Sequence, residues 1–147
     1  MTIFDRIIAG ELAASLVHQD EICIVFMDIN PITRGHALVV PRRSVPTLAQ
    51  LDAATRTHLW EIALRIGQAQ QRALGSQAQH LMINDGKAAS QTVPHVHVHV
   101  IPRYHGDTLH TLAKILWHVT TITMPRRETA ARRLELNAIA AKIRAAL

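Results

Sequence analysis

The segment PHVHVHVIPR, residues 94–103, places histidines at three alternate positions, His95, His97 and His99. Alternate side chains of a β-strand point to the same face, so a strand here would align the three imidazoles on one face and the valines between them on the other. The valines are expected to pack against a helix. A lone histidine is usually structural, but three histidines at this spacing indicate a metal-binding or catalytic role.

Two kinds of chemistry use such a row of imidazoles. Neutral imidazole is a common zinc ligand, and an imidazole can also attack an electrophile while its neighbours stabilise the developing charge. The preceding loop, NDGKAASQTV at residues 84–93, supplies amides, hydroxyls and glycine. Those groups donate hydrogen bonds to an anion, whereas a zinc site requires carboxylates or carbonyls that orient its imidazoles. The loop therefore favours a phosphate-containing substrate over a zinc ion.

The elements that must position these side chains follow from the rest of the chain. Residues 24–31, 36–41 and 80–85 are short apolar runs bounded by turn residues, and we expect strands there. Asp52 is the expected N-cap of a long helix that ends at Leu74, before Gly75. A second amphipathic helix is predicted from Pro125 in its first turn, with an apolar stripe of Leu136, Ala140, Ile143 and Leu147. The predicted fold class is α+β, an antiparallel sheet with one long helix and a C-terminal helix.

Length and composition indicate one domain. The chain has 147 residues, of which 48% are hydrophobic. We expect residues 1–106 to form the core and residues 107–147 a helical extension packed on the same domain. Cys23 is the one cysteine, which permits no internal disulfide, and its apolar neighbours suggest a buried residue rather than a nucleophile. No apolar run reaches roughly 18–20 residues and no signal-peptide pattern is present, so we expect a soluble, cytoplasmic protein with no membrane contact.

The charge distribution limits the possible partners. The formal net charge is +5, and residues 125–147 contain six Lys or Arg against two Glu. Such a segment is more often a solvated helix face than a nucleic-acid site, and the chain has no interleaving of basic and aromatic residues that would stack single-stranded bases. Nucleic acid is therefore not an expected partner.

The ordered motifs of the chain resemble those of the histidine triad family. The stretch SQTVPHVHVHVIPR matches the family pattern of three histidines separated by hydrophobic residues, and IFDRIIAGEL, VFMDINPITRGHALVVP and MINDG match in order before it. The resemblance covers residues 3–106. It implies a homodimer in which each subunit binds a purine nucleotide, and a nucleotidyl hydrolase or transferase reaction that needs no cofactor.

The resemblance also implies roles for the residues around the phosphate. His97 would attack the α-phosphorus and form a nucleotidyl-histidine intermediate, from which water releases the nucleoside monophosphate. His99 and Asn84 would contact the phosphate oxygens. Thr92 would contact a phosphate or leaving-group oxygen, and Gln91 would lie near the leaving phosphate.

The resemblance also implies which residues fix the tautomers of the triad and which bind the nucleoside. His36 would help to fix the tautomers of the triad, whose first member is His95. Asp28 would hold the ribose hydroxyls. The walls of the base pocket would be apolar: Ile3, Phe4, Ile7, Phe26 and Ile29.

Elementary chemistry is consistent with these roles, although most of the residues also have a structural explanation. Imidazole is a competent nucleophile near neutral pH because its ordinary pKa is about 6.5. Its reacting nitrogen must be free, so a backbone carbonyl or another group is expected to hold the proton on the other nitrogen. Asp28 and Asn84 are also natural turn residues, and His36 is also an ordinary strand end. The remaining histidines have no motif and are interpreted as structural or surface residues: His18, His58, His80, His105, His110 and His118.

The sequence departs from the family at a metal site. Many bacterial members bind a structural zinc ion through two cysteines near the N-terminus, a histidine after the second strand and the first histidine of the triad. Here Thr2, Asp5 and Ser44 occupy the first three positions and only His95 remains. We therefore predict no structural metal.

The branch of the family and the substrate stay open. The triad segment followed by HGD resembles the fragile-histidine-triad branch, which cleaves dinucleoside polyphosphates, whereas Asp28 within DINP resembles the nucleotide-binding, phosphoramidase branch. Ser90 stands where a glycine usually precedes the glutamine. A nucleotide-binding regulatory protein with little turnover is the alternative function, and a zinc hydrolase built on the three histidines is a further one.

Overall fold

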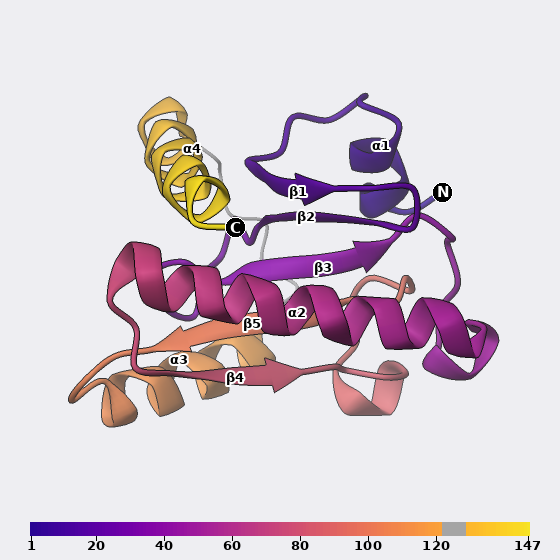
Figure 1. Ribbon diagram of the computed structural model, residues 1–147. Coiled ribbons are helices and arrows are strands. Elements are labelled where there is room, and N and C mark those ends of the chain that lie inside the picture. The colour runs from indigo at the N-terminus through magenta and orange to yellow at the C-terminus, as the bar shows by residue number, and fades with distance from the viewer. Residues whose placement is uncertain (122–128) are drawn as a thin grey trace.

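The protein is built on a five-stranded antiparallel sheet with the strand order β1-β2-β3-β5-β4 (Figure 1). The computed structural model describes residues 1–121 and 129–147. The strands are β1 (Leu16–Gln19), β2 (Cys23–Met27), β3 (Ala37–Pro41), β4 (Ala78–Met82) and β5 (Val98–Arg103). The helices are α1 (Ile3–Ile8), α2 (Ala53–Leu74), α3 (Thr108–Thr121) and α4 (Ala130–Ala145), with short 3₁₀ turns η1 (Leu48–Gln50) and η2 (Lys87–Ala89). The predicted α+β class and antiparallel sheet are confirmed.

The two faces of the sheet bury different side chains, as the period of two predicts. On one face, Val39, Val98 and Val100 belong to the main core, with α2 packed over them and α4 packed beside it on β1 and β2. On the other face, Phe26 lies opposite Leu38, and Leu38 lies opposite His99. Both apolar residues form a smaller core on that face with Phe4 of α1. The histidines therefore face α1, away from the long helix.

The long helix α2 has the predicted ends. Asp52 is its N-cap, and the Asp52 side chain accepts a hydrogen bond from the Thr55 backbone N–H. The helix ends at Leu74, and Gly75 follows with φ of +72°, a left-handed conformation that glycine adopts without steric cost. Figure 1 shows α2 running across one face of the sheet. Helix α2 covers the valines of β3 and β5 on one face of the sheet. The side chains on the opposite face are therefore the ones that line the site.

The C-terminal helix α4 is an integral part of the core. Leu136, Ala140 and Ile143 are buried as predicted, together with Ile139, but Leu147 is 39% exposed because it lies beyond the end of the helix. The predicted start at Pro125 lies outside the described residues, and the domain boundary at residue 106 stays a prediction.

The arginines of α4 are not simply solvated, as the sequence suggested. Arg132 donates to the carbonyl of Ile29, Arg133 to that of Ala13, and Arg144 to that of Leu16. Because carbonyls accept these hydrogen bonds, half of the basic residues between positions 125 and 147 hold α4 against the N-terminal part of the fold. Within the described residues, no helix is long and apolar enough to span a membrane.

Some boundaries differ from the predicted ones. The strand β5 begins at Val98, so His95 and His97 precede it in an extended segment. The reason is that the Val96 N–H binds the carbonyl of Val45, while Pro41 of β3 has no N–H to offer. Strand β4 covers residues 78–82 rather than 80–85. The short elements α1 and β1 were not predicted, because six and four residues are too few for a clear period.

Candidate active site

A cavity of about 410 Å³ opens beside the histidines on the α1 face of the sheet. This volume lies in the range of ligand pockets, which is roughly 300–1,000 Å³. Its lining includes His97, His99 and Thr92, together with all six residues assigned by resemblance to ribose and base: Ile3, Phe4, Ile7, Phe26, Asp28 and Ile29. These residues, which are separated by up to 96 positions in the chain, therefore share one pocket. Its lining combines imidazoles with apolar side chains.

His97 has the tautomer that a nucleophile requires. Its Nδ1 lies 2.8 Å from the carbonyl oxygen of His95, and a carbonyl only accepts hydrogen bonds, so Nδ1 carries the proton and Nε2 keeps its lone pair. The ring is 5% exposed and packs edge-on against Phe4, with ring centroids 5.1 Å apart. Burial lowers the pKa of His97 below its ordinary value, against the opposing effect of the His95 carbonyl. The ring is therefore neutral at physiological pH.

His36 and His99 form a hydrogen-bonded relay. The backbone N–H of Ile32 donates to His36 Nδ1 at 3.2 Å, so the proton of His36 resides on Nε2. His36 Nε2 then donates to His99 Nδ1 at 3.0 Å. By the same reasoning the proton of His99 resides on Nε2, the nitrogen on the far side of its ring. The relay makes His99 a hydrogen-bond donor, which is what a phosphate oxygen requires.

Asp28 has two roles in the geometry of this corner. Its Oδ1 accepts from the backbone N–H of Asn30 at 2.8 Å, so the carboxylate caps the turn after β2. Its Oδ2 lies 3.5 Å from His36 Nδ1. Asp28 also lines the cavity. The structural explanation of Asp28 as a turn cap is therefore confirmed, and its contact with the ribose stays a prediction.

The phosphate-loop residues are only partly brought to the cavity. Thr92 lines it, but Asn84 and Gln91 are not among the lining residues. The Gln91 amide instead accepts from the Gly86 N–H at 2.9 Å and donates to the Pro46 carbonyl at 2.8 Å, while Asn84 donates to the Ser90 carbonyl. Both side chains thus hold the loop in shape, and their phosphate contacts stay predictions.

Ser90 has a backbone conformation that glycine adopts more readily than other residues. Its φ is +63°, in the left-handed region that residues with a Cβ rarely adopt. The loop therefore keeps the glycine-like conformation although the residue is serine.

Two polar lining residues were missed by the sequence analysis. Asn30 lines the cavity beside Asp28, and its place in the same turn was a usable indication. Arg133 of α4 also lines it, while donating to Ala13 O and Ser15 Oγ. No local pattern marks Arg133, because it lies 30 residues beyond the triad segment and reaches the pocket only through the packing of α4.

Comparisons with known proteins show the family of this chain. The HIT domain model matches residues 9–106. The chain belongs to the histidine triad family. A HIT-like protein of Mycobacterium tuberculosis is 41% identical over 107 residues, 73% of this chain and 74% of that one. The adenylylsulfatase HINT3 of Arabidopsis thaliana is 34% identical over 107 residues, 73% of this chain and 54% of that protein.

Solved structures of histidine triad proteins extend the match to the C-terminal helices. A Hit-like protein of Bartonella henselae superposes with a TM-score of 0.79 at 29% identity, covering 99% of this chain and 96% of that one. A zinc-bound histidine triad protein of Mycobacterium smegmatis has a TM-score of 0.77 at 31% identity, covering 98% and 91%.

The residues around His95 do not fit the zinc site expected in bacterial members of the family. Thr2 Oγ1 and Ser44 Oγ each lie 3.3 Å from His95 Nδ1, and Asp5 Oδ1 lies 3.5 Å from it. His95 Nε2 lies 2.8 Å from the carbonyl of Pro41, to which it donates. Structural zinc is held by thiolates and imidazoles, whereas this set offers two hydroxyls, one carboxylate and one imidazole. The four positions form a hydrogen-bonded cluster, and the absence of a metal here stays a prediction.

Proposed function

We propose that the protein is a nucleotidyl hydrolase or transferase that attacks the α-phosphate of a purine nucleotide substrate through His97. The Nε2 lone pair of His97 forms a bond to phosphorus, the bond from phosphorus to the leaving group breaks, and a nucleotidyl-histidine results. Water then attacks phosphorus and releases the nucleoside monophosphate. The substrate is a nucleoside phosphoramidate or a dinucleoside polyphosphate.

The orientation of His97 carries this proposal. A proton held on Nδ1 by the His95 carbonyl leaves Nε2 available beside the cavity, and the relay from His36 supplies a donor on His99 next to it. The ring centroids of His97 and His99 are 4.8 Å apart, so one phosphoryl group can contact both. Fixed donors aimed at phosphoryl oxygens are usually the largest contribution to such catalysis.

Two relatives indicate the substrate class without choosing between its members. One is named an adenylylsulfatase. The other, from Schizosaccharomyces pombe, is named an asymmetrical bis(5'-nucleosyl)-tetraphosphatase and is 35% identical over 96 residues, 65% of this chain and 53% of that protein. Both names describe cleavage next to a nucleotide phosphate, with different leaving groups.

The test compares adenosine phosphoramidate with diadenosine triphosphate for the wild type and for His97→Ala. We expect the wild type to release AMP from at least one of them, and the variant to lose more than the ~10²–10³-fold that loss of one transition-state donor costs. The preferred substrate assigns the branch of the family. Release from neither substrate, or a His97→Ala variant as active as the wild type, would contradict the proposal.

The alternative function, a nucleotide-binding regulator with little turnover, predicts a different chemical outcome. A pure binder requires the pocket but not a nucleophile with a free nitrogen. Single-turnover reactions with labelled substrate, quenched and analysed for acid-labile phosphorus on the protein, separate the two functions. Label on the wild type and none on His97→Ala supports the enzyme.

We also propose that two copies of the chain associate through the β4–α3 side of the fold. Strand β4 is at the edge of the sheet, where its outer backbone groups are available to a second strand. Leu109 and Leu112 of α3 are 83% and 54% exposed, and Leu116 shares their helix face. An exposed apolar helix beside an edge strand is typical of an interface.

Light scattering coupled to size-exclusion chromatography tests this association. The double variant Leu109→Glu, Leu112→Glu is expected to be monomeric while the wild type is dimeric. The matched control is Leu134→Glu, because Leu134 is 69% exposed on α4, and this variant should stay dimeric. A monomeric wild type would refute the dimer.

A further inference from the structure

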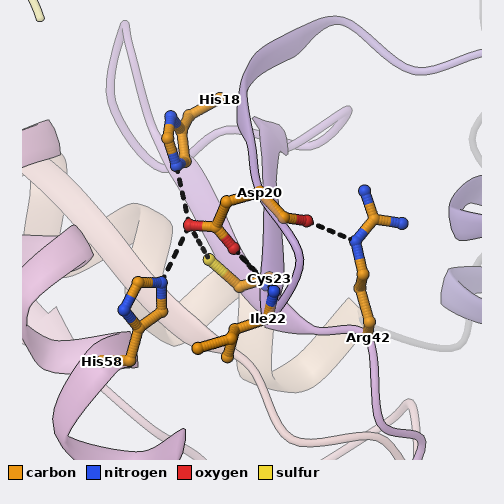
Figure 2. Close-up of polar contacts among 6 residues, drawn as sticks. All are labelled: His18, Asp20, Ile22, Cys23, Arg42 and His58. Atoms are coloured by element: carbon orange, nitrogen blue, oxygen red, sulfur yellow. Dashed lines mark hydrogen bonds and ion pairs between the residues drawn. The ribbon is translucent and has the colours of Figure 1, made fainter.

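A second cluster of ligand-type side chains lies at the turn between β1 and β2, on the α2 face of the sheet. Figure 2 shows His18, Asp20 and Cys23 of this hairpin and His58 of α2 directed toward one point. His18 Nε2 lies 3.0 Å from Asp20 Oδ2, and His58 Nε2 lies 2.8 Å from the same oxygen. The Cys23 thiol lies 3.7 Å from it. We call these four residues the hairpin cluster.

A bulge in β1 brings His18 to this face. Leu16 pairs with Phe26, whose side chain belongs to the smaller core on the active-site face, whereas His18 pairs with Val25 of the main core on the α2 face. Residues two apart in a regular strand share a face. The register shift between Leu16 and His18 therefore turns the imidazole toward α2, where Cys23 is also buried.

Asp20 is held in one orientation by hydrogen bonds to the backbone of the hairpin and to Arg42. Its Oδ1 accepts from the backbone N–H groups of Ile22 and Cys23 at 2.8 and 2.7 Å. Arg42 Nε donates to the Asp20 backbone carbonyl at 2.6 Å, as Figure 2 shows. Only Oδ2 is left to face the imidazoles and the thiol. Outer hydrogen bonds that fix a ligand in this way are typical of metal sites.

We propose that the hairpin cluster binds a divalent transition-metal ion of the zinc type, through His18 Nε2, Asp20 Oδ2, Cys23 Sγ and His58 Nε2. His18, Asp20 and Cys23 offer three ligand atoms within 4.8 Å of one another. Tetrahedral zinc, with bonds of about 2.0–2.3 Å, separates neighbouring ligand atoms by about 3.3–3.8 Å. Rotation of the His58 side chain, whose Nε2 lies 2.8 Å from Asp20 Oδ2, would bring a fourth ligand atom to the other three. Imidazole and thiolate ligands select zinc-type ions over calcium and magnesium.

The fourth ligand, His58, would make the bound ion a link between two elements of the fold. His58 lies on α2, and the other three residues lie on the hairpin. An ion bound by all four would join the β1–β2 hairpin to the long helix. The side chains of His18, Asp20 and His58 are 22%, 28% and 30% exposed, so an ion can enter from solvent.

The proton balance of binding follows from the state of the thiol. Burial, and then the negative charge of Asp20, raise the pKa of Cys23 to about 12, so its sulfur carries a proton when no ion is bound. On binding, the S–H bond breaks, a metal–sulfur bond forms and one proton passes to solvent, while the imidazoles bind in their neutral form.

Cobalt(II) is the probe, because its absorption reports both ligand type and geometry. Cys23 is the one cysteine of the chain, so a thiolate-to-cobalt charge-transfer band can come from this site alone. Titration of the metal-free protein should give the band and the visible bands of tetrahedral cobalt at one equivalent. Zn²⁺ should displace the cobalt and raise the Tm, as any ligand selective for the folded state does.

Variants separate the site from adventitious binding. Cys23→Ser should lose the band, and His18→Gln should weaken cobalt binding by more than the ~10–100-fold that loss of an outer-shell partner costs. His80→Gln, an exposed histidine on β4, is the matched control and should keep both. Cys23 is buried, so circular dichroism checks the fold of Cys23→Ser, and His18→Gln carries the test independently.

Two results would overturn the proposal. One is cobalt that binds the wild type without a charge-transfer band, and the other is Zn²⁺ that leaves its Tm unchanged. Nucleotide cleavage has no part in this test, because the cluster lies on the α2 face and the cavity on the α1 face of the sheet. An ion at the hairpin cluster would contradict the expectation that the chain holds no metal, which was drawn from the residues around His95.

Discussion

The relay through His36 gives a prediction that separates catalysis from stability. His36 is fully buried, accepts from the Ile32 N–H and donates to His99. A glutamine at this position places an N–H near the former Nε2 and can still donate to His99. An asparagine places an acceptor near the former Nδ1 and can still bind Ile32. Each variant therefore keeps one half of the relay.

The two variants should lose similar stability and very different activity. Each leaves one buried polar group without its partner, which costs about 1–3 kcal/mol of unfolding free energy. His36→Asn removes the hydrogen bond that keeps the His99 proton on Nε2, so the donor to the phosphate is lost and the rate should fall about 10²–10³-fold. His36→Gln should stay within about tenfold of the wild type, since it retains that hydrogen bond.

Three measurements check this reasoning. Urea unfolding gives the free energies, and kcat/KM is measured on whichever nucleotide substrate the wild type cleaves. The ¹⁵N chemical shifts of the His99 ring report the position of its proton independently of activity. Equal activity losses in the two variants, or a His99 proton on Nδ1 in the wild type, would refute the role of the relay.

The remaining predictions concern His97 and the turn before His36. Burial lowers the pKa of His97, and the nucleophile is the neutral ring, so the acidic limb of the kcat/KM profile should have its midpoint below the ordinary value of about 6.5. A midpoint at or above that value would contradict the assignment of His97. The same lowered pKa means that the unfolded chain binds the proton more tightly, so the contribution of His97 to stability is present above pH ~6.5 and is lost as pH falls from there through the lowered pKa. In Gly35→Ala, the new Cβ would lie 2.5 Å from Leu74 Cδ1 at a φ of +94°, so left-handed strain and overpacking together should cost about 2–5 kcal/mol. Gly75→Ala, at φ +72° with no atom within 4 Å, should cost only the ~1–2 kcal/mol of backbone strain, and equal losses of unfolding free energy in the two variants would contradict the steric part.

Much of the fold was readable from local patterns. The alternation of histidine and valine in residues 95–100 predicts which side chains face the core, because the period of a strand is fixed by its backbone. Asp52 and Gly75 mark the ends of α2, because a cap requires a side-chain acceptor at one end and a left-handed residue at the other. These features depend on residues close together in sequence, and a single sequence is enough to find them.

The candidate site was only partly readable. Motif spacing identified the histidines and the apolar walls, and the structure places His97, His99 and those apolar walls around one cavity. The sequence could not predict that Gln91 is directed toward Pro46 rather than toward the cavity, because this orientation depends on a contact between residues 45 positions apart. Arg133 was missed for the same reason, since α4 reaches the pocket only by packing on the sheet.

What the sequence alone predicted is therefore the kind of chemistry: three imidazoles on one face, beside groups able to donate hydrogen bonds to an anion. What only the tertiary structure decided is the state of each nitrogen. The proton of His97 is placed by the carbonyl of His95, and that of His99 by His36, 63 positions away. The hairpin cluster likewise depends on a bulge and on a helix that arrives 38 residues after Asp20. Hydrogen-bond partners set tautomers and ligand geometry, and partners distant in the chain are chosen only when the core packs.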